Sequence, residues 1–389
     1  MHHVPLSPRL LRGATLAVAV TLIAACDRTQ PTELAMPTQA SAAKDGKNTG
    51  DVSALGTPTV VGGGLNNPRG LAFGPDGAIY VAESGTGGTT STVGQCQQVP
   101  APGGPLTSGN TGRISRIDGG VRTTVIDNLP SSIDQRGSVL GVMDVAFVGP
   151  KLYALLNAGC GHGVPNVPAS VIRVEGGSYS VEANLTEFVQ ANPVANPEPA
   201  DFEPDGDWYS LVAQGGMLYA VDANGGQVVS VQPNSGRIDR IVDVSAVVGH
   251  VVPTAIADGN GRFFLGNLTT FPSVPGSGRI FELDRSGSFV EILAGFAPVL
   301  GLVADKHDNL YVLETFSCLP QLPCVPAPFS QGTGRVLRIN KKDRSREVIA
   351  TGLTFPTSMR LGPDGALYVS NKGYNLPPGS GEVLRIAID

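Results

Sequence analysis

The chain has 389 residues, of which 41% are hydrophobic and 15% are charged, so it can bury a large core and is unlike a disordered or coiled-coil protein. Its formal net charge of −6 offers no basic surface for a phosphate backbone, which argues against nucleic acid as a partner. The 51 glycines and 31 prolines separate short runs of valine, isoleucine, leucine and tyrosine, which favours an all-β fold of many short strands.

Residues 1–25 have the pattern of an export signal. Arg9 and Arg12 precede the apolar stretch ATLAVAVTLIAA, which is too short to span a bilayer but suits the core of a signal peptide. The four residues Ile23 to Cys26 resemble a bacterial lipobox, in which the cysteine thiol receives a diacylglycerol. We therefore expect a lipoprotein signal peptide, with lipidation at Cys26. The alternative is an ordinary signal peptide followed by a chance cysteine.

Residues 26–56 are polar, contain no aromatic side chain and show no hydrophobic period, as expected of a flexible tether. A chain of this length would span on the order of 30 Å, enough to hold a domain clear of a membrane. We expect an exported protein that touches the membrane only through its lipid, with the folded domain in the periplasm or outside the cell.

Residues 57–389 contain one strand pattern six times. Its marker is an aromatic residue in a short apolar strand, at Tyr80, Tyr153, Tyr219, Phe264, Tyr311 and Tyr368. Another apolar strand and a turn precede each marker, and a third strand such as GRISRI or GEVLRI follows it. Four antiparallel strands repeated about every 45 residues are typical of propeller blades. The pattern predicts a six-bladed β-propeller.

The two ends of this domain are expected to meet. The last repeat stops after GEVLRIAID and lacks a fourth strand, whereas the domain begins with an isolated strand at Thr57 to Leu65. Pairing this N-terminal strand with the C-terminal blade would close the ring and cover two sheet edges that would otherwise be exposed.

Long connections between second and third strands are expected on one face, at 84–111, 158–169 and 315–333. Four cysteines lie in these loops: Cys96, Cys160, Cys318 and Cys324. An even number in an exported domain favours two disulfides. The short spacing of the last two suggests a local bridge, which leaves Cys96 to pair with Cys160. The alternative is a metal site built from Cys160 and His162.

The segment NPRGLAFGPDGAIYVAE is similar to blades of NHL and SMP-30/gluconolactonase-like propellers. Over residues 57–389 the chain most resembles the exported ScyD/ScyE family, which is associated with scytonemin biosynthesis. The stretch FEPDGDWYSLVAQGGMLYAVDANGGQVVSV resembles a more particular segment of that family, with Asp222 and Asn224 in its turn. The chain departs from the family pattern at Asp207-Trp208-Tyr209, where a Ser-Asn-Pro-Tyr-like run is common.

Polar side chains follow the markers by three residues in five of the six repeats, at Glu83, Asp222, Asn267, Glu314 and Asn371, whereas the second repeat has Leu156. We expect them to form a ring at the channel mouth. Converging oxygen donors suit Ca²⁺ or another divalent cation, and the resemblance to SMP-30-like lactonases implies a metal in the channel. The alternative is that these are solvated strand ends.

Two further candidates carry weaker patterns. The acids of DFEPDGD, residues 201–207, begin like a calcium loop, but Val212 stands where a closing glutamate is required, so a solvated acidic turn is the favoured interpretation. His250 lies on the expected loop face and is a candidate base or ligand-binding residue.

Two function classes remain. The favoured one is a lipid-anchored module at the cell envelope that binds a ligand or an envelope protein through Asp222, Asn224, Asn267, Glu314, Asn371 and His250. The alternative is a divalent-metal-dependent hydrolase of lactone-type small molecules, which requires that the ring acids bind the metal beside a base.

Overall fold

The computed structural model describes residues 56–270, 273–317 and 331–388, nearly all of which are strands and turns. The signal peptide, the tether up to residue 55, Cys26, Cys318 and Cys324 lie outside the described residues. Within the described ranges, no helix is long and apolar enough to cross a membrane.

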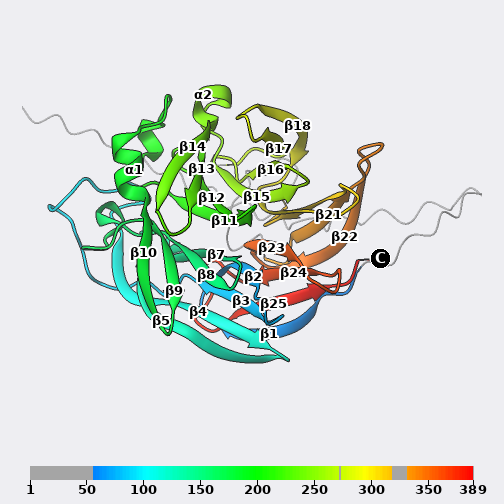
Figure 1. The fold of residues 1–389 in the computed structure, drawn as a ribbon, viewed down its shortest axis with the longest axis horizontal. Coiled ribbons are helices and arrows are strands. Elements are labelled where there is room, and N and C mark those ends of the chain that lie inside the picture. The colour runs from blue at the N-terminus through cyan, green and yellow to red at the C-terminus, as the bar shows by residue number, and fades with distance from the viewer. Residues whose placement is uncertain (1–55, 271–272, 318–330, 389) are drawn as a thin grey trace, which may run out of the picture. The chain divides into compact units, whose positions relative to one another are not determined.

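Six antiparallel sheets form the domain and confirm the six-bladed propeller (Figure 1). The strands of the first three blades are β2 (Pro68–Phe73), β3 (Ile79–Glu83), β4 (Thr107–Asp118), β5 (Val121–Ile133) and β6 (Val139–Leu140); β7 (Val142–Val148), β8 (Lys151–Leu156), β9 (Ser170–Glu175) and β10 (Ser178–Asn184); and β11 (Trp208–Gln214), β12 (Met217–Asp222), β13 (Gln227–Gln232) and β14 (Arg237–Asp243).

The strands of the fourth and fifth blades are β15 (Pro253–Gly259), β16 (Arg262–Asn267), β17 (Gly278–Asp284) and β18 (Phe289–Phe296); and β19 (Val299–Ala304), β20 (Leu310–Glu314), β21 (Gly334–Ile339) and β22 (Arg346–Leu353). The sixth blade contains β23 (Ser358–Leu361), β24 (Leu367–Asn371), β25 (Gly381–Ile386) and β1 (Thr59–Leu65). Short helices interrupt the connections: α1 (Leu185–Ala191), α2 (Val244–Val248) and the 3₁₀ turns η1 (Cys160–His162) and η2 (Pro199–Asp201).

The predicted closure of the ring is confirmed. Strand β1 pairs antiparallel with β25, with Leu65 opposite Gly381, and so supplies the outer strand of the sixth blade. Leu65 is fully buried. A side chain at Gly62 would come within 2.5 Å of Ile117 in the first blade, so β1 also packs closely against its neighbour.

The aromatic markers recur because they bridge adjacent blades. Tyr80 of the first blade packs edge-on against Phe147 of the second, with ring centroids 4.9 Å apart. Tyr368 of the sixth blade meets Phe73 of the first in the same way, also at 4.9 Å. A marker is therefore buried by packing against a side chain of the neighbouring blade. Because every blade has such a neighbour, an aromatic residue recurs at this position in each repeat.

The innermost strands β2, β7, β11, β15 and β23 gather at the middle of the ring (Figure 1). A buried ion pair crosses this region: Arg360 of β23 donates to Asp144 of β7 at 2.7 Å. The same carboxylate accepts the backbone N–H of Leu211 in β11 at 2.8 Å, so three blades meet at one side chain. Gly70 is required here, because a Cβ would lie 1.7 Å from the Asp144 carboxylate.

Candidate functional site

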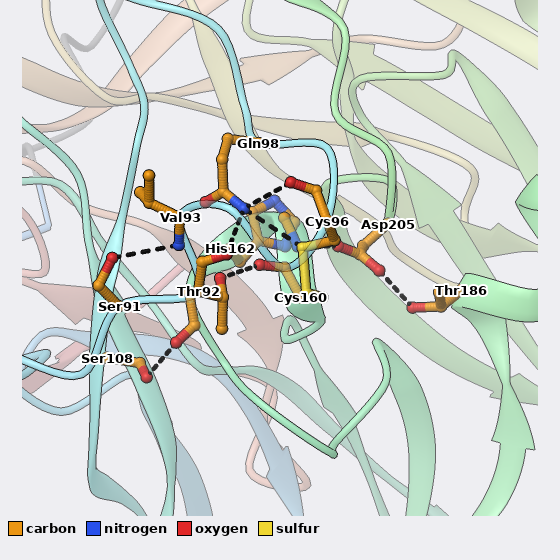
Figure 2. Close-up of a disulfide and its surroundings, with 12 residues drawn as sticks. Ser91, Thr92, Val93, Cys96, Gln98, Ser108, Cys160, His162, Thr186 and Asp205 are labelled. Carbon is orange, nitrogen blue, oxygen red and sulfur yellow. Dashed lines mark hydrogen bonds between the residues drawn. A yellow bond between two sulfur atoms is a disulfide. The ribbon is translucent and has the colours of Figure 1, made fainter.

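The connections 84–106, 157–169 and 192–207 meet at one end of the first three blades, which we call the loop face. A disulfide joins Cys96 of the first connection to Cys160 of the second, with Cα atoms 6.2 Å apart, and confirms this predicted pair (Figure 2). The Thr92 hydroxyl donates to the carbonyl of Cys160. The first two blades are therefore tied together covalently on this face.

Asp205 anchors the third connection to the second (Figure 2). Its carboxylate accepts the N–H of Gly161 at 2.7 Å and the hydroxyl of Thr186 at 3.0 Å. Gly159 has a φ of 113°, and a Cβ there would lie 2.1 Å from the Asp205 carboxyl carbon, so only glycine fits. Because protein groups bind both Asp205 oxygens, the acids of 201–207 shape a structural turn.

His162 and Glu203 form an ion pair between the second and third connections. The Nε2 of His162 lies 2.6 Å from a Glu203 oxygen, and its Nδ1 lies 2.8 Å from the carbonyl of Ala158. The imidazole is completely buried. Burial alone would lower the pKa of His162, but the hydrogen bond to Glu203 and the charges of Glu203 and Asp205 raise it to about 9. The ring is therefore an imidazolium at neutral pH.

Asp207 lies at the end of the third connection, and the pKa of its carboxyl group is raised. Burial, followed by the negative charge of Glu203, raises the pKa of Asp207 to about 8. Its Oδ1 accepts the side-chain amide of Asn157 at 2.5 Å. The Oδ1 of Asn157 is itself buried without a hydrogen-bond partner. Asp207 therefore keeps its proton at neutral pH beside the Glu203 side chain that binds His162.

A cavity of about 380 Å³ opens beside the disulfide, and we call it the disulfide pocket. Part of its lining, the apolar wall, is hydrophobic, and another part, the polar wall, carries acids and amides. The apolar wall contains Val189, Pro193, Val194, Pro197 and Phe202, and the polar wall contains Glu203, Asp205, Asp222, Asn224 and Gln227. Two residues predicted to bind a ligand, Asp222 and Asn224, are therefore in this pocket.

The five predicted ring residues share a position, but each is hydrogen-bonded within its own blade. Glu83 accepts the Asn66 N–H at 2.7 Å and pairs with Arg113 at 2.6 Å. Glu314 accepts the Ala297 N–H at 2.8 Å and pairs with Arg335. Each carboxylate thus joins the start of its innermost strand to the third strand.

The other three ring positions repeat this role. Asp222 accepts the Asp207 N–H at 3.1 Å and the side-chain amide of Gln227 at 2.8 Å. Asn371 accepts the Thr354 N–H at 2.9 Å. Asn267 donates to the carbonyl of Val251 at 2.9 Å and accepts the Arg279 N–H at 2.6 Å.

Each of the five side chains is thus engaged by groups of its own blade. In the described ranges, no group of three or more histidine, cysteine, aspartate or glutamate side chains is placed to hold a metal ion. The predicted ring also includes the amides of Asn267 and Asn371, so a divalent cation bound there stays a prediction. Cys160 is in a disulfide with Cys96, so the alternative metal site built from Cys160 and His162 is wrong.

His250 and Asn224 bind residues of the segment 201–207. The Nε2 of His250 lies 3.1 Å from an Asp201 oxygen. Asn224 accepts the Glu203 N–H at 2.9 Å and donates to the carbonyl of Asp201. His250 does not line the disulfide pocket, so of these two residues only Asn224 is in the candidate site.

Sequence reasoning did not assign Glu203 and Asp207 a role beyond an acidic turn. The alternate acids of residues 201–207 and the CGHG motif around His162 were the available signals. These two signals are far apart in the sequence: His162 and Glu203 are separated by 41 positions. No local pattern could show that they meet.

No protein-family model matches the chain, and neither does any curated protein. Among solved structures, the chain is similar to the PQQ-bound aldose sugar dehydrogenase of Streptomyces coelicolor, with 12% identity over 86% of this chain and 98% of that chain and a TM-score of 0.53. It is also similar to a candidate oxidoreductase (glucose dehydrogenase) of Thermus thermophilus, with 18% identity over 86% of this chain and all of that chain and a TM-score of 0.52.

A gluconolactonase of Xanthomonas campestris is a further structural neighbour, with 8% identity over 88% of this chain and 94% of that chain and a TM-score of 0.49. The likeness to the first two structures, at TM-scores above 0.5 and identities below 20%, shows a shared fold and no more.

Proposed function

We propose that this chain is an exported, lipid-anchored propeller of the ScyD/ScyE type that binds a small molecule in the disulfide pocket. The pocket is the observation that carries the proposal. Its volume of about 380 Å³ lies within the range of small-molecule sites, roughly 300–1,000 Å³. It is built by loops that a disulfide and several buried hydrogen bonds hold in place, as expected of a largely preformed site.

The walls of the pocket favour a ligand with one apolar face and at least one hydrogen-bond donor. No lysine or arginine is among the described residues that line it. One Glu203 oxygen bonds to His162, whereas the other has no hydrogen-bond partner among the described groups. A carboxylate oxygen only accepts hydrogen bonds, so it suits a hydroxyl or a protonated amine. The proposed ligand is therefore neutral or cationic.

The disulfide and the N-terminal pattern support the exported part of the proposal. Disulfides persist in secreted and periplasmic proteins and are rare in the reducing cytosol. The Cys96–Cys160 bridge lies beside the pocket, where it would hold the first connection against the second after export.

Hydrolysis of a lactone-type molecule is the second candidate. Asp207 carries a proton at neutral pH because its pKa is raised to about 8, whereas Glu203 is paired with the His162 imidazolium. A protonated carboxyl group such as that of Asp207 can act as a general acid in hydrolysis. The metal-dependent form of this activity gains no support from the donor set of the described residues.

Titration calorimetry with tyramine as a cationic aromatic probe tests the binding proposal. The full chain should bind tyramine saturably, and both Phe202→Ala and Glu203→Gln should weaken binding. Glu175→Gln is the control. The Glu175 side chain is 77% exposed at the end of β9 and does not line the disulfide pocket, so this substitution should leave tyramine binding unchanged. Equal binding by all four proteins, or no saturable binding, would contradict the proposal.

The second candidate is tested by following acid release from glucono-1,5-lactone, with and without Ca²⁺ or Mn²⁺. Release above the buffer rate that Asp207→Asn abolishes would establish the hydrolase. Release at the buffer rate under every condition would leave binding as the function.

A further inference from the structure

A second cavity, of about 290 Å³, adjoins the disulfide pocket on the loop face, and we call it the proline cavity. Its lining comes from the connections 84–106 and 192–207 and consists of Gln97, Gln98, Pro100, Pro197, Pro199 and Phe202. Most of these side chains are apolar rings, and none is charged. Gln97, Pro197 and Phe202 also line the disulfide pocket, so the two cavities meet along these three side chains.

Phe202 is a hydrophobic side chain that the core does not use. It is half-buried and belongs to none of the hydrophobic clusters of the described residues. Among the same residues it forms no aromatic pair. Ligand pockets are lined mainly by hydrophobic and aromatic side chains, and Phe202 lines two cavities instead of joining the core. It can therefore contact an apolar group in each of them.

The backbone beside Phe202 is held in place by hydrogen bonds. The next residue, Glu203, donates its N–H to the side chain of Asn224 at 2.9 Å. The facing connection is fixed by Gln98, whose side-chain amide donates to the carbonyl of Cys96 at 3.1 Å (Figure 2). Both walls of the proline cavity are therefore formed before a ligand arrives, which lowers the entropic cost of binding.

Gln97 provides a polar group where the two cavities meet. It is exposed, and its side-chain amide makes no hydrogen bond with the described residues. A glutamine amide can both donate and accept hydrogen bonds. It can therefore bind the polar link of a molecule that extends from one cavity into the other.

The volumes of the two cavities set the size of what they can hold. A cavity of roughly 150 Å³ is enough for one benzene ring. The proline cavity, at about 290 Å³, therefore admits one ring, and the disulfide pocket, at about 380 Å³, admits a second ring with a polar chain.

We propose that the ligand is an elongated molecule with two ring groups, one in each cavity, joined by a link that carries a hydrogen-bond donor and passes Phe202. Because no described residue that lines the proline cavity is charged, the ring placed there is neutral and apolar. This inference rests on the function proposed for the disulfide pocket, and it adds the length and shape of the ligand.

Titration calorimetry of the full chain with N-methyltyramine and N-benzyltyramine tests the second ring site. Both amines are secondary ammonium ions at neutral pH, and they differ only in a phenyl group that replaces one methyl hydrogen. Burial of this phenyl group should make N-benzyltyramine bind at least about tenfold more tightly. One molecule of either amine should bind per chain.

Pro199→Ser changes the proline cavity alone, because Pro199 does not line the disulfide pocket. The substitution removes apolar surface, so it should weaken binding of N-benzyltyramine at least about threefold. It should leave binding of N-methyltyramine unchanged. Pro363→Ser is the control, at an exposed proline between β23 and β24 that lines neither cavity, and it should leave binding of both amines unchanged.

Equal affinity of the parent for the two amines would overturn the second ring site and leave the disulfide pocket as a single-ring site. An advantage of N-benzyltyramine that survives Pro199→Ser in full would place its phenyl group elsewhere and would also overturn the inference. Two molecules of N-methyltyramine per chain would indicate two separate sites instead of one elongated site. No saturable binding of either amine would contradict the proposed function itself, and this inference with it.

Discussion

The His162–Glu203 pair should make the stability of the domain depend on pH. Burial alone would lower the pKa of His162, but Glu203 raises it to about 9 in the folded protein, compared with 6.5 in an exposed histidine. At about 1.4 kcal/mol per pH unit, this difference contributes about 3 kcal/mol to the free energy of unfolding. The folded state binds the proton more tightly, so the contribution is complete below pH 6.5 and disappears as pH rises through about 9.

Asp207 changes stability in the same direction. Burial and the neighbouring Glu203 raise the pKa of Asp207 to about 8, far above that of an unfolded aspartate. Its ionisation in the folded protein becomes increasingly costly as pH rises from about 4 to 8. The charge of His162 lowers the pKa of Asp207, so His162→Gln removes the contribution of His162 together with this effect on Asp207.

Urea unfolding at about pH 6, 7.5 and 9 measures this difference. Trp208 is the single tryptophan of the chain, is fully buried and donates to the carbonyl of Asp205 at 3.1 Å, so its fluorescence reports on this segment. The parent should lose about 3 kcal/mol more than His162→Gln over this range. Glu203→Gln should also remove the excess loss. A constant difference between parent and His162→Gln at all three pH values would refute the reasoning.

Five further substitutions have expected outcomes. Leu65→Ala in the closing strand should lower the free energy of unfolding by about 2–5 kcal/mol, whereas Val60→Ala, at an exposed position of the same strand, should change it by less than about 0.5 kcal/mol in urea titrations. Cys96→Ser opens a disulfide with a sequence separation of 64 and should cost up to about 4 kcal/mol, seen as a lower melting temperature. Glu314→Gln should destabilise the fold by about 1–3 kcal/mol without altering any response to Ca²⁺, because the side chain joins Ala297 and Arg335. Cys26→Ser should abolish labelling by a radioactive fatty acid in cells, and unchanged labelling would contradict the lipoprotein proposal.

The repeat, the number of blades and the closing strand could be predicted because they depend on local patterns. An aromatic residue in each second strand must bury itself against the next blade, so the pattern returns with every blade, as Tyr80 and Tyr368 show. The isolated strand that ends at Leu65 had no partner in its own neighbourhood and required one at the other end of the chain.

The five polar positions after the markers are a repeated set, and in the structure each of them is hydrogen-bonded within its own blade. The arginines of the third strands contained a relevant signal, because Glu83 lies opposite Arg113 and Glu314 lies opposite Arg335 in the antiparallel register. An opposite charge directly across a ladder favours a pair within the sheet over a shared ligand in the channel.

The environments of His162 and Arg69 could not be predicted from the sequence. His162 meets Glu203 only because two long connections from adjacent blades fold over each other. Arg69 is buried beside Tyr209, a residue of another blade 140 positions away, and burial of a charge depends on all the elements around it. Such contacts are set by tertiary packing, and no period or motif records them.

A crystal structure of the full chain grown with saturating tyramine would test the central claim most directly. We expect electron density for the probe in the disulfide pocket, with its ring against Phe202 and its ammonium group within hydrogen-bonding distance of the Glu203 oxygen that does not contact His162. Density for the probe at another site, or a disulfide pocket that stays free of it at saturation, would contradict the claim that this pocket is the binding site.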